Sequence, residues 1–195
     1  MEWGSNSFGQ CDVPEPNEGF LAIAAGAVHS VALREDSTLV AWGDNLQGQC
    51  ELPDPNEGFV DVWAGYWNAQ VLRPDGSVVV FGHEGVGQCR VPNSLNEGYV
   101  EITCNYKTSM GMKSDGSLVA WGNNFYGQCD IPEPNQDYVA VSLGDLHCIG
   151  LRPDSTIIAW GQDFYGQCDI PEPNEDFVAI EAGTYHSLAL RADGS

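Results

Sequence analysis

The sequence has very few basic residues. Only seven lysines and arginines stand against 28 acidic residues in 195 positions, which gives a formal net charge of −21. The seven are spread along the chain and form no readable basic patch. A phosphate backbone would be repelled by such a surface, so nucleic-acid binding is not expected. Hydrophobic residues make up 43% of the sequence and include six tryptophans, which excludes a disordered acidic chain.

Long apolar segments are also missing. No run approaches the roughly 20 apolar residues that a membrane span needs, so no membrane association is expected. Residues 1–10 contain neither a positively charged start nor an apolar stretch, so no signal peptide is visible. Seven cysteines are an odd number and cannot all pair in disulfides. These features favour a cytoplasmic setting with reduced thiols.

What the sequence does contain is one repeat of about 39 residues, copied five times. An aromatic residue followed by glycine marks each copy, at Trp3, Trp42, Phe81, Trp121 and Trp160. A Gly-Gln-Cys triplet follows each marker, with its cysteine at Cys11, Cys50, Cys89, Cys129 and Cys168. One extra residue lies in the segment Val91-Pro-Asn-Ser-Leu-Asn-Glu-Gly98, where the other copies have Pro-x-Pro-Asn.

Within a repeat the hydrophobic period is two residues, which indicates short β-strands. The last complete stretch shows four such runs, at 155–161, 167–171, 177–183 and 186–191. Asp-Gly pairs predict tight hairpin turns between the second and third strands of a repeat. Pro-x-Pro marks the longer return to the next repeat, because proline cannot continue a central strand. Each repeat is therefore predicted to be a four-stranded antiparallel unit.

Such repeated units predict an all-β protein, a β-propeller with five four-stranded blades in a single domain over residues 1–195. The alternative is a linear solenoid, which needs atypical polar capping repeats that this sequence lacks. The chain stops between the second and third strands of a repeat and begins at the end of a third strand. We therefore expect residues 1–4 to complete the last blade and to close the ring by pairing the N- and C-terminal segments.

The pattern Ala-Gly-x-x-His-Ser-x-Ala-Leu, followed by Asp-Gly and Trp-Gly at fixed offsets, resembles the regulator-of-chromosome-condensation repeat family. The short repeat is most similar to the bacterial members, of which β-lactamase inhibitor protein II is the best-known type. The resemblance implies a propeller of four-stranded blades. Members of this family exchange nucleotides on small GTPases, inhibit enzymes or sense ultraviolet light. The insertion linked to nucleotide exchange has no counterpart here, and no functional residue can be transferred.

In repeat folds, binding residues usually lie in the variable loops. Two kinds of loop are irregular here and rich in aromatic residues: the loop between the first and second strands, and the loop that follows the third strand. The predicted partner-binding residues are Trp63, Tyr66, Trp67, His83, Tyr106, Lys107 and Tyr185. We expect a monomeric, non-enzymatic module, without cofactor or metal, that binds a protein partner; the family resemblance implies an inhibitor-like role. Alternatives are a lectin, in which the aromatic rings stack on sugars, and a structural scaffold or designed ring without a dedicated ligand. The alternative for several of the loop aromatics, notably Phe125 and Phe164, is that they pack between blades.

Four groups of polar residues have a structural explanation. The five Gly-Gln-Cys cysteines are expected to be small buried residues, one per blade, while Cys104 and Cys148 remain unexplained. The histidines His29, His147 and His186 share one repeat position and are expected to hydrogen-bond neighbouring backbone; the alternative is that they converge on a metal. The turns between the second and third strands and the returns to the next repeat lie at the other end of the strands and are acidic. They form either a solubilising surface or a docking surface for a basic partner. The basic residue that ends each second strand is expected to pair with nearby acids.

Overall fold

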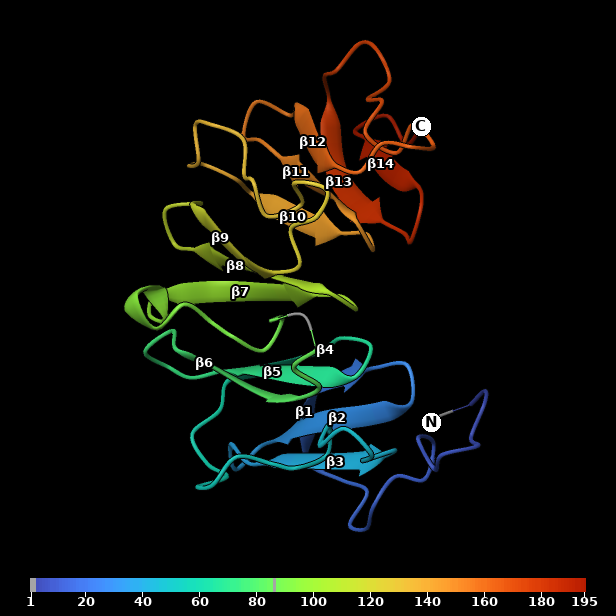
Figure 1. Ribbon diagram of the computed structural model, residues 1–195, viewed down its shortest axis with the longest axis vertical. Helices are drawn as coiled ribbons and strands as arrows, with labels where there is room; N and C mark the ends of the chain where they lie inside the picture. Colours follow the sequence, from blue (N-terminus) through green and yellow to red (C-terminus); the bar gives the residue numbers. More distant parts are fainter. Residues whose placement is uncertain (1–2, 86) are drawn as a thin grey trace. The chain divides into compact units, whose positions relative to one another are not determined.

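The computed structural model describes residues 3–85 and 87–195, and these form fourteen strands in five antiparallel sheets (Figure 1). One short 3-10 turn, η1 (Asn93–Leu95), occupies the position of the extra residue in the third return. Among the described residues there is no helix that is long and apolar enough to cross a membrane. The chain divides into two compact units, which we describe separately.

The first unit comprises residues up to Gly85 together with Cys89–Tyr99 and holds two complete sheets. Its strands are β1 (Phe20–Ala25), β2 (His29–Arg34), β3 (Leu39–Gly43), β4 (Asp61–Ala64), β5 (Asn68–Leu72) and β6 (Val78–Gly82). The strands of each sheet run in chain order, β1-β2-β3 and β4-β5-β6, as the repeat predicted.

The second unit comprises Val100–Ser195 together with Gly87 and Gln88. Its strands are β7 (Tyr99–Cys104), β8 (Thr108–Lys113), β9 (Leu118–Gly122), β10 (Ala140–Leu143), β11 (His147–Leu151), β12 (Ile157–Gly161), β13 (Phe177–Ala182) and β14 (Ser187–Arg191). The first two sheets have the order β7-β8-β9 and β10-β11-β12, and the last has only β13-β14. Each repeat thus forms one blade-like sheet.

The prediction of a fourth strand per sheet is wrong: no sheet in the described part of the chain has more than three. The Gly-Gln-Cys segment forms a turn instead. In the first repeat the Glu51 amide donates to the Gly48 carbonyl, and the Cys50 amide donates to Asn45 Oδ1 at 2.9 Å. These amides bond within the turn rather than to a neighbouring strand, so no fourth ladder forms there.

The Gly-Gln-Cys segment also lies beside the sheet of the following repeat rather than its own. The carbonyl of Gln10 accepts hydrogen bonds from Ser30 Oγ of β2 and from Trp42 Nε1 of β3, each at 2.9 Å. At the same repeat position, the indole of Trp121 donates to the Gln88 carbonyl and the indole of Trp160 donates to the Gln128 carbonyl. The tryptophan therefore connects three of the sheets to the preceding turn through a specific polar contact.

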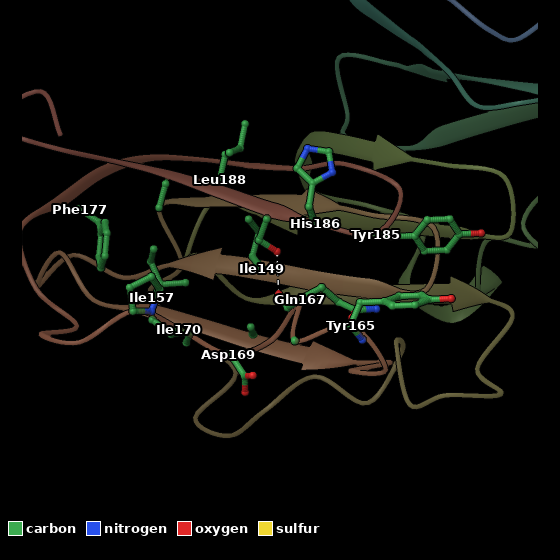
Figure 2. Close-up of a pocket in the computed structure, with 15 residues that line it drawn as sticks. Ile149, Ile157, Tyr165, Gln167, Asp169, Ile170, Phe177, Tyr185, His186 and Leu188 are labelled. Atoms are coloured by element: carbon green, nitrogen blue, oxygen red, sulfur yellow. Dashed lines mark hydrogen bonds between the residues drawn. The ribbon is translucent and has the colours of Figure 1, made fainter.

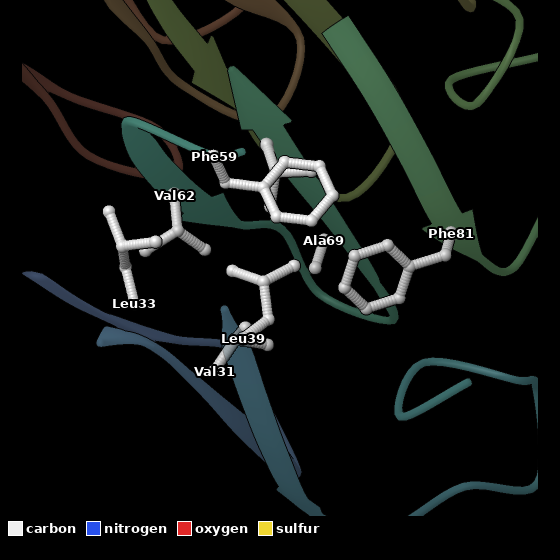
Figure 3. Close-up of a cluster of buried hydrophobic side chains, with 8 residues drawn as sticks. Val31, Leu33, Leu39, Phe59, Val62, Ala69 and Phe81 are labelled. Carbon is white, nitrogen blue, oxygen red and sulfur yellow. The ribbon is translucent and has the colours of Figure 1, made fainter. Parts of the chain in front are cut away.

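The core of the first unit lies between its two sheets (Figure 3). It contains Val31 and Leu33 of β2, Leu39 of β3, Val62 of β4, Ala69 and Val71 of β5, Phe81 of β6 and the preceding Phe59. In the second unit, equivalent residues form two clusters, one around Met110, Tyr138 and Trp160 and one around Ile149 and Phe177. Apolar residues therefore fill the space between consecutive sheets, which is where the repeat pattern placed them.

An asparagine bridge connects the return segment to the start of the third strand. Asn56 Oδ1 accepts from the Leu39 amide at 2.8 Å, and Asn56 Nδ2 donates to the Leu39 carbonyl at 2.9 Å. Asn96, Asn135 and Asn174 make the same pair of bonds to Val78, Leu118 and Ile157. The asparagine side chain thus bonds both the amide and the carbonyl of the first residue of the third strand, as a neighbouring strand would.

The basic residues that end the second strands interact electrostatically with the turn aspartates, as Arg152 does with Asp154, but Arg152 and Arg191 make their close contacts elsewhere. The guanidinium of Arg152 lies 3.8 Å from the ring centroid of Tyr138, and Arg191 lies 4.9 Å from that of Phe177. Arg152 and Arg191 also donate to the backbone carbonyls of Pro134 and Pro173, at 2.7 and 2.6 Å. Aromatic faces and peptide carbonyls therefore hold these arginines in place of carboxylates, because the return segment brings both within reach.

Candidate binding surfaces

The first unit carries four of the predicted partner-binding residues. Tyr66, Trp67 and His83 form a chain of edge-to-face rings, with centroids 4.9 Å apart for Tyr66–Trp67 and 5.5 Å for Trp67–His83. Tyr66 is exposed, while Trp67 and His83 are half-buried. Trp63 lies within β4, opposite the buried Gln70 of β5, and is also half-buried. The structure therefore brings Tyr66, Trp67 and His83 together and leaves Trp63 on a strand.

The second unit carries the other three. Tyr106 and Lys107 lie in the loop between β7 and β8, where the ammonium of Lys107 is 5.2 Å from the Tyr106 ring centroid. Tyr185 lies in the loop between β13 and β14 and is exposed. Its ring makes an edge contact with Tyr165 at 5.6 Å. Lys107 thus has an aromatic neighbour, and Tyr185 belongs to a different, larger aromatic group.

That group contains residues that sequence reasoning missed. Phe125 and Phe164, for which packing between blades was the alternative, are 80% and 71% exposed. Tyr126 contacts both of them, at 4.9 Å and 5.6 Å between centroids. We call Phe125, Tyr126, Phe164, Tyr165 and Tyr185 the aromatic patch; its ring contacts form two sets, Phe125–Tyr126–Phe164 and Tyr165–Tyr185, which adjoin in the chain at Phe164 and Tyr165. The signal in the sequence was the Phe-Tyr pair repeated before Gly-Gln in two copies, which occurs in no other repeat.

The position of the aromatic patch follows from the sheet topology. The loop before each second strand and the turn after each third strand lie at the same end of a sheet, because the strands alternate in direction. Gln162 follows β12, and Leu146 precedes β11. The backbone amide of Gln162 donates to the carbonyl of Leu146 at 2.9 Å, so the two loops lie together. Rigid turns therefore hold the aromatic rings at one end of the sheets of the second unit.

The histidine position is structural. The rings of His29, His147 and His186 occupy the space that a side chain would need at Gly26, Gly144 and Gly183, which explains the Gly-x-x-His spacing. His147 Nε2 lies 2.9 Å from Ser187 Oγ in the following repeat. Burial lowers the pKa of His29 from 6.5 to about 4, against the opposing effects of a hydrogen bond with the Asn68 backbone and of Asp44. His29 is therefore neutral at physiological pH.

No group of three or more His, Cys, Asp or Glu side chains in the described chain is arranged to hold a metal ion. The turn aspartates instead cap their own turns: Asp36 Oδ1 accepts from the amide of Thr38 at 3.1 Å and from its hydroxyl at 2.7 Å. The hydrogen bonds from Thr38 lower the pKa of Asp36, and Asp154 is lowered in the same way by Thr156. Local turn chemistry therefore accounts for this repeated acidic position.

All seven cysteines are free thiols, and only Cys148 is fully buried. Each Gly-Gln-Cys thiol lies near the backbone carbonyl six residues before it, such as Cys89 Sγ to the His83 carbonyl at 3.0 Å. Cys148 Sγ takes the position of Ser30 and donates to the Gln128 carbonyl at 3.3 Å. Burial raises the pKa of Cys89 to about 12 and those of Cys129 and Cys168 to about 11. These thiols close turns and are poor nucleophiles.

We expect Cys89 and Cys129 to be alkylated by iodoacetamide at pH 8 at least about 100-fold more slowly in the native protein than in denaturant, because the thiolate is the reactive form. Peptide mapping by mass spectrometry after timed quenching measures each cysteine separately. The same residues in urea provide the control. Equal native and denatured rates at Cys89 would contradict the structural role of its thiol.

Comparison with known proteins agrees with this geometry. A profile of the regulator of chromosome condensation (RCC1) repeat matches residues 20–49 and 99–128. Two segments of the chain are therefore similar to the regulator of chromosome condensation repeat. The matched segments cover β1 to β3 and β7 to β9 with the turns that follow them. The similarity to the short-repeat bacterial subtype stays a prediction, and no curated protein sequence matches the chain.

Solved structures share the fold of this chain. Prp20p from Saccharomyces cerevisiae is 20% identical with a TM-score of 0.73, over 92% of this chain and 57% of that one. Human WBSCR16 is 16% identical with a TM-score of 0.73, over 92% and 61%. The ectodomain of the Physcomitrella patens receptor kinase CR4 is 17% identical with a TM-score of 0.74, over 90% and 51%. The prediction of an all-β propeller is confirmed, and the chain spans just over half the length of these structures.

Proposed function

We propose that the chain is a non-enzymatic binding module that engages a protein partner through the loops at one end of its sheets. The aromatic patch carries this proposal. Five aromatic rings gather on turns there, and Phe125, Phe164, Tyr165 and Tyr185 are exposed although each could bury a large area. Exposed aromatic residues on rigid supports are typical of binding hot spots, because little conformational entropy is lost when they are covered.

Two further observations support a protein as the partner. The structure of Prp20p was described together with its binding properties to Gsp1p and histones, so an RCC1-type propeller can act by binding proteins. The net charge of −21 would favour association with a basic protein surface through long-range attraction. An inhibitor-like role, in which the aromatic patch covers a functional surface of the partner, is the finer form of the same proposal.

The proposal is tested with a partner isolated by affinity capture and then purified. Replacing Phe164, Tyr165 and Tyr185 together with alanine should weaken binding by at least about 30-fold, as expected when hot-spot aromatics are removed. A second variant, Tyr66→Ala, tests the first unit separately. Titration calorimetry against the purified partner gives the dissociation constants.

The matched control replaces Val100 and Val178 with alanine, because these valines are also exposed but lie on strands β7 and β13 rather than on the loops. This variant should bind within about twofold of the original chain. Loss of binding in the control but not in the aromatic variant would place the interface elsewhere.

A lectin remains the second candidate function, since Tyr165 and Tyr185 could stack on sugar rings. Repeated sugar sites would need similar loops in each repeat, yet the turns after the third strand differ among the copies. A glycan array distinguishes the two functions: strong, competable glycan binding that is lost in the aromatic variant would favour the lectin.

A further inference from the structure

The aromatic patch exposes ring faces on two neighbouring turns. Phe125 and Tyr126 lie on the turn after β9, and Phe164 and Tyr165 on the turn after β12. The planes of Phe125 and Tyr126 meet at 80°, and those of Tyr126 and Phe164 at 84°. In an edge-to-face pair, the ring that presents its edge keeps both of its faces clear of its neighbour. The exposed rings therefore leave faces open on which a flat group can stack.

Carboxylates are anchored in the same two turns. In the turn after β12, Asp163 Oδ1 accepts a hydrogen bond from the Cys168 amide at 2.8 Å. In the turn after β9, Asp130 Oδ1 accepts from Asn124 Nδ2 at 2.7 Å. Both aspartates are exposed, and these hydrogen bonds hold their carboxylates within the turns. Each aromatic turn therefore presents a fixed negative charge together with its rings.

The adjoining loops add two more carboxylates. Figure 2 shows the rings of Tyr165 and Tyr185 pointing the same way, with Asp169 on the turn that carries Tyr165. Asp169 Oδ2 lies 2.9 Å from the point where a Cβ would stand on Gly166. Asp145 lies in the loop between β10 and β11, which is hydrogen-bonded to the turn after β12. We call the turns after β9 and β12, with the loops before β8, β11 and β14, the loop end of the second unit.

In the described part of the second unit, a single basic side chain, Lys107, belongs to the loop end. Its ammonium lies over the ring of Tyr106. The other basic residues of this unit, Lys113, Arg152 and Arg191, end second strands and so lie at the opposite end of the sheets. The loop end therefore carries an excess of negative charge, which attracts a cationic ligand.

The protein itself shows which cation suits a ring face beside oxygen acceptors. Arg34 lies 5.2 Å from the ring centroid of Phe20 and donates to the Pro16 carbonyl at 3.2 Å, and Arg152 and Arg191 make the same pair of contacts in their own repeats. A planar guanidinium can stack on a ring and donate from its edge at the same time, whereas a lysine ammonium is a compact point charge. The loop end offers this combination to an arginine from outside, with carboxylates in place of carbonyls.

The acidic turns at the opposite end do not offer open rings. Phe59 and Tyr138 are buried there, and Arg73 and Arg152 already lie over them. An incoming arginine would find carboxylates at that end, but ring faces that are already stacked. Charge alone would attract it equally to both ends, so the open rings decide in favour of the loop end.

We propose that the partner places an arginine-rich segment on the aromatic patch, with guanidinium groups stacked on Phe125, Phe164 and Tyr165 and paired with the carboxylates of the same turns. This inference rests on the proposed function and adds the chemistry of the partner's contacting side chains. The carboxylates orient each guanidinium by charge-assisted hydrogen bonds, while the ring covers its face. Binding should therefore prefer arginine to lysine and weaken as salt screens the exposed carboxylates.

The test titrates the full chain with three labelled synthetic peptides in which glycine alternates with arginine, with lysine or with citrulline. Citrulline keeps the planar shape of arginine and lacks its charge. We expect the arginine peptide to bind at least about fivefold more tightly than the lysine peptide and at least about 30-fold more tightly than the citrulline peptide. Fluorescence anisotropy at several salt concentrations measures these affinities, and the arginine peptide should bind more weakly as salt rises.

A variant that carries both Asp130→Asn and Asp163→Asn tests the carboxylates. Asparagine keeps the acceptor oxygen that the turn uses, as Asn124 does at the repeat position of Asp163. This aspartate variant should bind the arginine peptide at least about fivefold more weakly. The matched control, Glu172→Gln with Glu175→Gln, makes the same change in net charge at the opposite end and should bind within about twofold.

A second variant, Phe125→Ala with Phe164→Ala, tests the rings. Both side chains are exposed, so circular dichroism should show an unchanged fold. This phenylalanine variant should bind the arginine peptide at least about tenfold more weakly and should lose the preference for arginine over lysine. Equal affinity of the original chain for the arginine and lysine peptides overturns the inference, because charge alone would then explain binding. Equal losses in the aspartate variant and in the glutamate control overturn it as well.

The same variants, measured against the purified partner, separate this inference from the proposed function. Binding that is lost in the phenylalanine variant and unchanged in the aspartate variant would leave the proposed function standing and refute the arginine contact. Binding that neither the phenylalanine variant nor the alanine variant of Phe164, Tyr165 and Tyr185 weakens would contradict the proposed function itself. Loss of partner binding in both the aspartate and the phenylalanine variants, with the glutamate control unaffected, supports both.

Discussion

Replacing Phe59 with alanine is expected to lower the free energy of unfolding by about 3–5 kcal/mol, the range for removing a buried phenylalanine. Phe59 is 1% exposed and lies in the core of the first unit with Val62, Ala69 and Phe81. Arg73 lies over its ring, 5.6 Å from the centroid. The substitution removes both the contact between the two sheets and the surface against which this arginine stacks.

The neighbouring Val60 provides the control, because its side chain is exposed on the same stretch of chain. Val60→Ala should change the free energy of unfolding by less than about 0.5 kcal/mol, as is usual at surface positions. Urea denaturation followed by tryptophan fluorescence measures both variants. Equal effects for the two variants would show that the space between the sheets is not a packed core.

Acid should destabilise the protein before its carboxylates titrate, and His29 should account for a large part of this effect. The folded pKa of His29 is about 4 and the unfolded value is 6.5. As the pH falls from 6.5 to 4, the unfolded chain takes up a proton that the folded chain excludes, so stability is lost over this window. Linkage puts the loss at no more than about 3 kcal/mol.

His29→Asn separates this contribution from that of His147, whose pKa burial also lowers. Asparagine stands at the same repeat position in Asn68, so the substitution places a residue that the fold already accepts. Urea unfolding at several pH values should give a flatter profile for this variant between pH 4 and 6.5. An unchanged slope would mean that His29 is protonated in the folded state.

The strands and their order could be predicted because the repeat averages the sequence signal over five copies. The aromatic-Gly pairs that begin at Trp42, Phe81, Trp121 and Trp160 each end a third strand, and Asp75-Gly76 and Asp115-Gly116 form the predicted turns. The fourth strand could not be excluded in this way. Alternation in a run such as Gln-Cys-Asp-Ile-Pro is also typical of a strand. The cysteine amide, however, donates its hydrogen bond to the side chain of an asparagine or aspartate five residues earlier, and so it does not pair with a neighbouring strand.

The candidate site was predicted less well, for a physical reason. Position in a repeat tells which end of a sheet a residue occupies, and this correctly placed Tyr66, Trp67 and Tyr185 on loops. It does not tell whether a ring turns inward or outward. Phe125 and Phe164 point into solvent because their turns are closed by polar side chains, such as Gln128 donating to Asn123, which occupy the inner side.

The asparagine bridge makes the return segment tolerant of altered length. Asn96 lies 18 positions after Val78 in the sequence, whereas Asn56 lies 17 positions after Leu39. Both asparagines make the same two hydrogen bonds. The extra residue is accommodated in η1, upstream of the asparagine, with the register of the strands unchanged. This return is accordingly a natural insertion point, where a peptide epitope or a recognition loop could be displayed while the sheets on either side keep their pairing.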